Sequence, residues 1–360
     1  MSLDMAIEDL RKEIDRLDAE LVELLNARAK VVVEVGKLKN ETHAPVYAPA
    51  REKEVFDKIA RENKGPLPNK TLWAIWRELM SGSFCLERPL RIAYLGPKGS
   101  FSHTAAMLKF GQSVEYEAVP DIRAIFDEVG KDHCDLGLVP IENSAGGGVR
   151  ESLDAFIDTN VMICGEIHMA IHHNLLANCG LDEIEKVYSQ PEVVAQCRNW
   201  LSTTLRDKQI ISVASTARAA EMAAKEPRAA AIASTVAADI YGLKVICADV
   251  EDVGNNVTRF LVIGAEDALP TGDDKTIILF STAHKTGALV DVLSMFKDFG
   301  INMTNIGSRP NKKREWEYYF FVDFLGHKDD DNVKKALEIA RQHCLQLSVL
   351  GSFPRSTTKL

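Results

Sequence analysis

The chain has 360 residues, of which 26% are charged and 46% hydrophobic, a composition typical of a soluble globular protein with two or three domains. Its net charge of −9 argues against a nucleic-acid-binding protein, because binding to phosphates relies on an excess of Lys and Arg. No apolar run reaches the ~18 residues of a membrane-spanning helix. The charged N-terminal stretch also lacks the apolar core of a signal peptide, so we expect a cytoplasmic protein without a membrane partner.

Residues 5–39 are predicted to form one long helix, because apolar residues recur there at near-heptad spacing. The stripe consists of Ile7, Leu10, Ile14, Leu17, Leu21, Leu24, Val31, Val35 and Leu38. A helix of this length spans about 50 Å and cannot bury such a stripe by itself. It needs the shorter helices that we expect at 50–62 and 69–86, or a second copy of itself.

Two cations lie on one face of this helix. Arg28 stands where the heptad requires an apolar residue, and Lys39 follows on the same face about 16 Å away. A buried cation must be paired, either by an anionic ligand or by a carboxylate on a neighbouring helix such as Glu52. Arg11 lies roughly 40 Å from Lys39 along the helix, so only an antiparallel partner helix brings it to the same small molecule.

The segments LRKEIDRLD, LLNARA and VEVGKLK, followed by Ala50-Arg51-Glu52, resemble the helical chorismate mutases. In that family intertwined dimers build each site from both chains, and chorismate rearranges to prephenate. The resemblance implies catalytic roles for Lys39, Glu52 and Glu87. It also implies substrate binding by Arg28, Arg51, Ser83 and, from the second chain, Arg11. On residue pattern alone, Ser83 and Glu87 could equally be a solvated helix end.

The rearrangement needs no covalent catalysis. The site must clamp two carboxylates in the reactive conformer and stabilise negative charge on the breaking ether oxygen. Arg11 and Arg28 suit the carboxylates, Lys39 the ether oxygen and Glu52 the ring hydroxyl. Two positions depart from the family: Ala48, where some members carry an acid, and Glu87, where some carry glutamine. A glutamate must be protonated to donate a hydrogen bond, so we expect mutase activity to fall as the pH rises.

From Arg91 to about residue 265, short apolar strands alternate with helices, which predicts an α/β domain with ligands at strand ends. GPKGSFSH at 96–103 opens a helix, where its amides could hold an anion or form a plain turn. VPIENSAGGG at 139–148 places a Glu-Asn-Ser cluster at a strand end. VTRF at 257–260 places a threonine and an arginine in an apolar strand, which could also be an ordinary strand with one solvated arginine.

In this order, GPKGSFSHTAA, VPIENS, SQPEVVAQC, STARAA, AAIAS and NNVTRF resemble the prephenate dehydratases. The family implies two α/β lobes, as in periplasmic binding proteins, with the site between them. The resemblance implies catalytic roles for Glu142, Asn143, Ser189, Gln196 and Thr258. It implies substrate binding by Ser215, Thr216, Arg259 and Phe260.

Prephenate loses CO2 and water, so the site needs a proton donor at the ring hydroxyl and an anchor for the side-chain carboxylate. The resemblance places Thr258 beside the hydroxyl, and Arg259 is an expected carboxylate anchor. A threonine is a weak acid, so it could relay or orient the proton rather than supply it. The identity of the proton donor stays open at this point.

Residues 266–275 are expected to be a linker, followed by strands and helices in the order βαββαβ of a small ferredoxin-like module. HKTGALVDVL (284–293), IGSRPN (306–311) and WEYYFFVD (316–323) resemble the ACT regulatory module, in which GAL and ESRP motifs frame a phenylalanine site at a dimer interface. The resemblance implies an allosteric site at Gly287, Ala288, Leu289, Val290, Ser308, Arg309 and Pro310. Gly307 replaces the glutamate of the family motif, which bears on the strength of inhibition.

The seven cysteines are scattered without a CxxC pair, so we expect free thiols and no disulfide framework. His168 and His172 have the i, i+4 spacing of helical metal ligands, but their stretch is predicted to be a strand. We therefore expect no metal and no cofactor.

The resemblances together imply a multidomain chain: an all-α chorismate mutase domain at 1–88, a two-lobed α/β dehydratase domain at 91–265 and an α+β ACT domain at 275–360. The expected function is conversion of chorismate through prephenate to phenylpyruvate in phenylalanine biosynthesis, with feedback inhibition by L-phenylalanine. We expect a homodimer or a higher homo-oligomer. The alternatives are a non-catalytic amino-acid sensor and a dehydratase that prefers arogenate.

Overall fold

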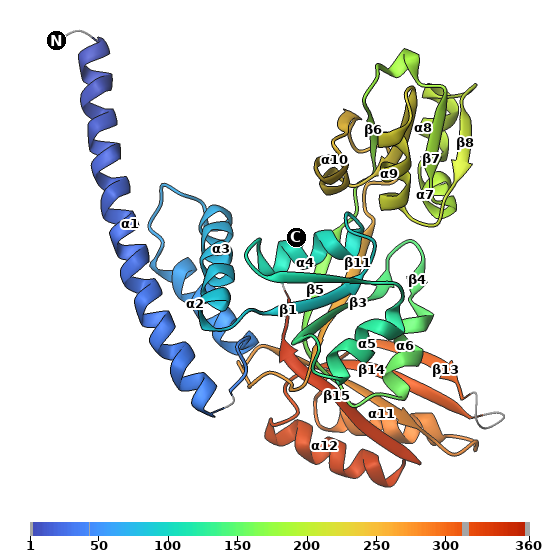
Figure 1. Ribbon diagram of the computed structural model, residues 1–360. Coiled ribbons are helices and arrows are strands. Elements are labelled where there is room, and N and C mark those ends of the chain that lie inside the picture. Colours follow the sequence, from blue (N-terminus) through green and yellow to red (C-terminus); the bar gives the residue numbers. More distant parts are fainter. Residues whose placement is uncertain (1–2, 43, 312–316, 357–360) are drawn as a thin grey trace.

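A computed structural model describes residues 3–42, 44–311 and 317–356 (Figure 1). Its first part consists of three helices, α1 (Leu3–Thr42), α2 (Pro49–Glu62) and α3 (Asn69–Glu87). The three predicted helices are thereby confirmed. Among the described residues, no helix is both long and apolar enough to cross a membrane.

Helix α1 extends beyond the other helices along one side of the molecule (Figure 1). Near its C-terminal end it packs closely on α3, because Gly36 has no side chain: a Cβ there would lie 2.9 Å from the Cα of Glu87. The predicted apolar stripe stays exposed beside this contact. All nine of its residues, from Ile7 to Leu38, keep between 41% and 68% of their surface exposed.

A first α/β lobe follows, with sheet order β2-β1-β3-β11-β5 and the short strand β4 on β3. Strands β1, β2 and β3 are parallel, whereas β11 runs antiparallel to both of its neighbours. The elements are β1 (Arg91–Leu95), α4 (Phe101–Phe110), β2 (Glu115–Val119), α5 (Ile122–Gly130), β3 (Leu136–Asn143), β4 (Gly147–Gly148), α6 (Arg150–Ile157), β5 (Met162–Ala170) and β11 (Val257–Gly264).

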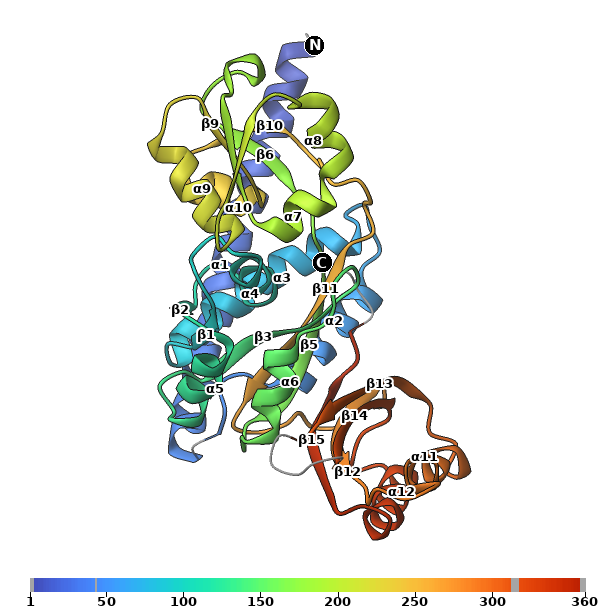
Figure 2. The same cartoon turned by 90° about the vertical axis from the view of Figure 1, so that its right-hand side faces the viewer.

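A second lobe is inserted between β5 and β11, so the chain passes twice between the lobes. Its sheet has the order β10-β6-β9-β7-β8. The elements are β6 (Asn174–Ala177), the 3-10 turn η1 (Leu181–Glu183), β7 (Lys186–Ser189), α7 (Pro191–Gln196), α8 (Arg198–Thr204), β8 (Gln209–Ser212), α9 (Thr216–Lys225), β9 (Ala229–Ala233), α10 (Thr235–Tyr241) and β10 (Lys244–Cys247). Figure 2 shows this lobe at one end of the molecule.

The C-terminal segment has the predicted βαββαβ order and forms a sheet of order β13-β14-β12-β15. Its elements are β12 (Asp274–Ser281), α11 (Ala288–Asp298), β13 (Met303–Pro310), β14 (Tyr318–Leu325), α12 (Asp331–Gln342) and β15 (Gln346–Pro354). Trp316, the first residue of the motif WEYYFFVD, lies outside the described residues.

One face of the C-terminal sheet packs directly on the first lobe (Figure 2). Phe321 and Leu350 from this sheet share a hydrophobic core with Leu261 and Ile263 from β11. The strands approach closely at Gly351, where a Cβ would lie 2.1 Å from the carbonyl oxygen of Ile163 on β5. The C-terminal sheet therefore rests on the sheet that contains β11.

Candidate active sites

The two cations on α1 face α3 and are paired with the side chains expected near them. Arg28 Nη1 donates a 2.8 Å hydrogen bond to Ser83 Oγ, and Lys39 Nζ lies 2.8 Å from Glu87 Oε2. Both α3 partners are shielded from solvent, because Ser83 is buried and the Glu87 side chain is only 9% exposed. The structure thus pairs both cations with side chains of α3, and an anionic ligand could replace Ser83 as the acceptor of Arg28.

The other three residues expected at this site lie elsewhere in the single chain. Glu52 faces the first lobe, where it pairs with Lys109 of α4 at 2.5 Å and accepts a hydrogen bond from Tyr47. It lines a cavity of about 260 Å³ between α2, the first lobe and the end of β15. Arg51 and Arg11 are exposed and pair with acidic neighbours on their own helices. Arg28 is therefore paired with Ser83 and not, as one alternative had it, with Glu52.

A hydrogen-bonded pair stands at the junction of the two lobes, where Thr258 at the start of β11 is opposite Asn143 at the end of β3. Asn143 Nδ2 donates 2.8 Å hydrogen bonds to Thr258 Oγ1 and to Asn256 Oδ1. Its other side-chain atom, Oδ1, accepts the backbone N–H groups of Ala145 and Gly146, both at 2.9 Å. These amides fix the orientation of the Asn143 side chain, so Thr258 accepts from Asn143 and its own proton is left to donate elsewhere.

The pair is linked to the second lobe. Asn256 Nδ2 lies 3.3 Å from Gln196 Oε1 at the end of α7, and the same oxygen lies 2.7 Å from His173 Nε2. Burial lowers the pKa of His173, so its imidazole is neutral at pH 7. With Nε2 donating to Gln196, Nδ1 of His173 is an acceptor buried without a hydrogen-bond partner. Asn143, Thr258 and Gln196 therefore belong to one polar chain that joins both lobes.

Glu142 and Arg259 do not face this chain, which corrects two sequence-based expectations. The register between β3 and β11 shifts between Arg259 and Phe260, so that Arg259 pairs with Glu142 while Phe260 pairs with Pro140. Glu142 directly precedes Asn143 and so faces the opposite side of the strand, toward the C-terminal sheet, where Asn305 Nδ2 lies 3.5 Å from Glu142 Oε2. Arg259 points the same way, because adjacent residues of a strand face opposite sides and Thr258 faces the lobe junction.

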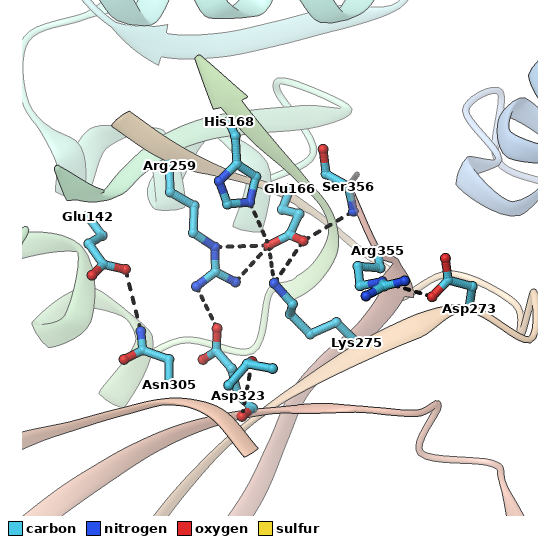
Figure 3. A network of polar contacts seen from close by, with 11 residues as sticks. Glu142, Glu166, His168, Arg259, Asp273, Lys275, Asn305, Asp323, Arg355 and Ser356 are labelled. Atoms are coloured by element: carbon cyan, nitrogen blue, oxygen red, sulfur yellow. Dashed lines mark hydrogen bonds and ion pairs between the residues drawn. The ribbon is translucent and has the colours of Figure 1, made fainter. Parts of the chain in front are cut away.

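Arg259 instead enters a buried cluster of charges between the first lobe and the C-terminal sheet (Figure 3). Its Nε lies 2.9 Å from Glu166 Oε2 on β5, and its Nη1 lies 2.5 Å from Asp323 Oδ2 on β14. Lys275 of β12 contacts both oxygens of Glu166 at 2.9 Å. The cluster holds two positive and two negative groups, which offsets the cost of burying each of them.

The charges of this cluster shift one another's ionisation. Burial raises the pKa of Glu166, but the hydrogen bond from His168 and the charges of Arg259 and Lys275 outweigh it and lower that pKa to about 2. Burial likewise opposes the charge of Arg259, yet Asp323 and Glu166 outweigh it and raise its pKa. Arg259 is thus held as a cation by two carboxylates and is not available to a substrate carboxylate at the lobe junction.

The remaining predicted dehydratase residues have local partners. Ser189 is buried at the end of β7, and Phe260 is buried in the core behind β1 and α4. Ser215 is the N-cap of α9 and accepts the backbone N–H of Arg218 at 3.1 Å, with Thr216 buried next to it. The N-terminus of α9 can still bind an anion through its backbone amides.

His168, His172 and His173 have different partners and do not form one ligand set. His168 Nε2 lies 3.5 Å from Glu166, whereas His172 Nδ1 lies 2.9 Å from Glu251. The third histidine contacts Gln196, as described above. The i, i+4 spacing brings two ligands together on a helix, but on this extended segment it leaves His168 and His172 with separate partners.

The two motifs of the C-terminal segment lie at the same end of its sheet. The ladder places Arg309 opposite Tyr319, and Tyr319 opposite Ser281, the last residue of β12. Gly287 follows six residues later with a positive φ of 83° and begins α11, a conformation that favours glycine. Arg309 pairs with Asp154 of α6 at 2.8 Å, so the second motif also contacts the first lobe.

Sequence reasoning missed several residues that the structure connects to the predicted ones. They are Asn256, His173, Glu166, Lys275, Asp323, Tyr47 and Lys109. A signal existed for Asn256, a polar residue two positions before Thr258 in the quoted motif NNVTRF. Asp323 ends the quoted motif WEYYFFVD, but nothing in the sequence indicated its pairing with Arg259, 64 residues away in the chain.

Three families match successive parts of the chain. Chorismate mutase type II matches residues 10–88, prephenate dehydratase matches 92–268 and the ACT domain matches 276–342. A bifunctional chorismate mutase/prephenate dehydratase of Aquifex aeolicus is 45% identical over 355 residues, covering 97% of this chain and 98% of that protein.

Solved structures match the part of the chain that follows the helices. A prephenate dehydratase of Arthrobacter aurescens in complex with L-Phe is 31% identical with a TM-score of 0.69, over 74% of this chain and 90% of that one. GqqA, described as a novel type of quorum-quenching acylase, aligns with the same TM-score of 0.69 at 26% identity, over 74% and 98%. Proteins with this fold are thus described with more than one function.

Proposed function

The chain belongs to the family of bifunctional chorismate mutase/prephenate dehydratases with a C-terminal ACT domain, and from this premise we propose which residues carry out its two reactions and their regulation. The proposed domain bounds are 1–88 for the mutase, 91–265 for the dehydratase and 275–360 for the ACT domain. The substrates are chorismate and prephenate, and the final product is phenylpyruvate.

For the mutase, the Arg28–Ser83 and Lys39–Glu87 pairs are the substrate-binding core. One chorismate carboxylate replaces Ser83 as the acceptor of Arg28, while Lys39 donates to the ether oxygen as negative charge develops there. Glu87 supports the same oxygen in its protonated form. Arg51 and Glu52 complete the site once α2 engages the substrate.

A second copy of the chain completes this site by supplying Arg11. The support is the exposed apolar stripe of α1, which a second α1 would cover in an antiparallel arrangement. Arg11 is also too far along the helix from Lys39 for both to contact one small molecule in one chain, being roughly 40 Å away. We therefore propose a homodimer or a higher homo-oligomer.

For the dehydratase, the orientation of Asn143 carries the proposal. Because Asn143 donates to Thr258 Oγ1, the Thr258 proton is directed to a ligand between the lobes. In prephenate the ring carboxylate leaves as CO2, the electron pair of the broken bond enters the ring, and the ring hydroxyl leaves with a proton as water. Thr258 donates a hydrogen bond to that departing hydroxyl, while Gln196 and Ser189 contribute from the second lobe.

With Arg259 committed elsewhere, the side-chain carboxylate of prephenate needs another anchor. We assign it to the N-terminus of α9, where Ser215 and Thr216 lie beside free backbone N–H groups. Such an anchor binds the carboxylate through backbone N–H groups and the helix dipole, without a cationic side chain.

L-phenylalanine is the proposed allosteric inhibitor, bound at Gly287–Val290 and Ser308–Pro310. Two observations support this site. Both motifs lie at the same end of the C-terminal sheet, and the Arthrobacter aurescens relative is a complex with L-Phe. Gly307 leaves out a side chain that the family motif provides, so we expect weaker binding than a glutamate would give.

Ultraviolet absorbance tests both reactions in one sample. The purified chain, without added metal or nicotinamide, should consume chorismate and form phenylpyruvate. Parallel assays with prephenate and arogenate decide which substrate the dehydratase prefers. If the chain consumed chorismate but formed no phenylpyruvate from chorismate or from prephenate, the dehydratase assignment alone would be contradicted.

A further inference from the structure

We propose that Arg259 is a positioning residue of the dehydratase, and that Asp323 of the ACT domain holds it in place so that the position of Thr258 depends on the ACT sheet. The inference rests on the dehydratase and regulatory functions proposed above. It gives the Arg259–Asp323 contact a role in catalysis and in feedback, although neither residue touches the substrate.

The first step of the argument is the place of Arg259 in β11. It follows Thr258 directly, so their Cα atoms are about 3.8 Å apart. The two side chains leave the strand on opposite faces, Thr258 toward Asn143 and Arg259 toward the ACT sheet. A displacement of the Arg259 backbone therefore moves Thr258 as well. The hydrogen bond between Thr258 and Asn143 responds to displacements of less than 1 Å.

The second step is how tightly Arg259 is held. Its side chain is 8% exposed, and those of Asp323 and Glu166 are 6% and 0% exposed. Glu166 holds Nε and Nη2 from within the first lobe, whereas Asp323 holds Nη1 from the ACT sheet (Figure 3). Because the planar guanidinium is held by a carboxylate on each side, a shift of Asp323 displaces the Arg259 side chain. Arg259 thus ties the catalytic strand to a strand of the regulatory sheet.

The third step connects Asp323 to the proposed L-phenylalanine site. Asp323 pairs across the ladder with Asn305 on β13, and two residues away Phe321 pairs with Gly307. Ser308, Arg309 and Pro310 follow Gly307 on the same strand. A ligand that shifts this end of β13 relative to the first lobe therefore moves β14, and with it the carboxylate that holds Arg259.

The bulge in β3 lies at the same position of the sheet. Its register shift lies between Arg259 and Phe260, directly beside the Thr258–Asn143 pair. Bulges locally disrupt the hydrogen-bonded ladder and commonly re-aim side chains next to active sites. Glu142, on the opposite face of the strand from Asn143, contacts Asn305, so both strands that present the catalytic pair also contact the ACT domain.

The test uses Asp323→Asn, Arg259→Lys and the double variant, with Lys328→Gln as the matched control. Lys328 of the ACT module pairs with Asp267 at 2.8 Å, so Lys328→Gln removes an ion pair that involves neither Arg259 nor Glu166. Thermal unfolding of the same full-length samples reports whether each variant is folded, and mutase kinetics report whether the helical segment is intact.

We expect Asp323→Asn to lower the dehydratase kcat about tenfold, because a displacement of about 1 Å at a reacting group is costly, while KM changes less than about twofold. The half-inhibitory concentration of L-phenylalanine should rise about tenfold although calorimetry still detects its binding, since the coupling and not the site is lost. The double variant should be no slower than Arg259→Lys alone, because both substitutions break the same contact.

Three results would overturn the proposal: dehydratase kinetics of Asp323→Asn equal to those of Lys328→Gln, additive effects in the double variant, or mutase and dehydratase rates that fall together. The unmodified chain separates this inference from the functions on which it rests. Failure of that chain to form phenylpyruvate would count against the dehydratase assignment, and a lack of inhibition by L-phenylalanine against the regulatory one.

Discussion

Asn143 donates a 2.8 Å hydrogen bond to the hydroxyl oxygen of Thr258, and two backbone amides hold Asn143 in the orientation that makes it the donor. The direction of this hydrogen bond matters more than its length. It leaves the Thr258 proton free to donate to a ligand between the lobes, which is the role that we propose for Thr258 toward the departing hydroxyl of prephenate.

Asn143→Asp tests this direction with almost no change in side-chain shape. A carboxylate accepts only, so Thr258 would turn its proton toward residue 143 and away from the substrate. We expect the dehydratase kcat to fall about 100-fold, within the usual range for a lost proton-donating group. Stopped assays of phenylpyruvate formation measure it, with mutase activity as the control for folding. A variant that retains its kcat would contradict the assigned direction.

Thr258→Ala removes the hydroxyl itself. Dehydratase turnover should fall about 10²- to 10⁴-fold, whereas mutase turnover should stay within about twofold because the helical site is separate. Thr258→Ser, which restores the hydroxyl, should recover most of the rate. Unchanged dehydratase kinetics in Thr258→Ala would refute the role of this residue.

Glu87→Gln tests the protonation state at the mutase site. Glu87 lies 2.8 Å from Lys39, and in the proposed mechanism it donates to the ether oxygen, which only a protonated carboxyl can do. The mutase kcat/KM of the parent should therefore fall as the pH rises, by up to about tenfold per pH unit. Glutamine donates at every pH, so the variant should show a flat profile over the same range. Identical profiles for both enzymes would exclude this explanation.

Leu24→Glu tests the proposed role of the exposed stripe. Leu24 is 68% exposed in the single chain, and a charge there would be buried when a second α1 covers it. We expect light scattering to show dissociation and mutase activity to fall about 100-fold at low protein concentration. Dehydratase activity should change little.

The matched control for this prediction is Asn26→Glu. Two residues further on, it places the same charge about 200° around the helix, away from the stripe. It should leave both the oligomeric state and the mutase rate unchanged. Equal behaviour of the two variants would argue against pairing of α1 helices through the stripe.

His103 provides a test of stability against pH. It is buried on α4, accepts the backbone N–H of Gly99 through Nδ1, and stacks on Tyr94. Burial, with a smaller contribution from Lys98, lowers its pKa from 6.5 to about 4. In the unfolded chain His103 therefore takes up a proton below about pH 6.5, whereas in the folded chain it does so only below about pH 4. Stability should fall across this window, by at most about 3 kcal/mol.

His103→Asn keeps an acceptor for Gly99 but does not titrate, so the melting temperature should fall less steeply between pH 6.5 and 4 than in the parent. His133→Asn, on an exposed histidine of the same lobe, should reproduce the parent's slope. A variant at position 103 with the parent's full pH dependence would show that another group causes the loss.

Much of the architecture follows from local sequence patterns. Heptad spacing predicted α1, alternation of short apolar strands with helices predicted the α/β lobes, and the βαββαβ order predicted the C-terminal sheet. Motif resemblance also indicated Asn143, Thr258 and Gln196, which the structure joins in one polar chain. These features depend on periodicity and on short segments, which a single sequence carries directly.

The sequence by itself determined that Thr258 and Arg259 lie on one strand and therefore face opposite sides of a sheet. Only the tertiary structure decided which side meets the second lobe and which meets the ACT sheet, because that depends on partners 64 and more residues away. The same holds for Glu142, whose partner Asn305 lies in the ACT sheet, and for Glu52, whose charge Lys109 of another domain compensates. A strand's pattern specifies its two faces, whereas the packing of whole domains specifies what each face contacts.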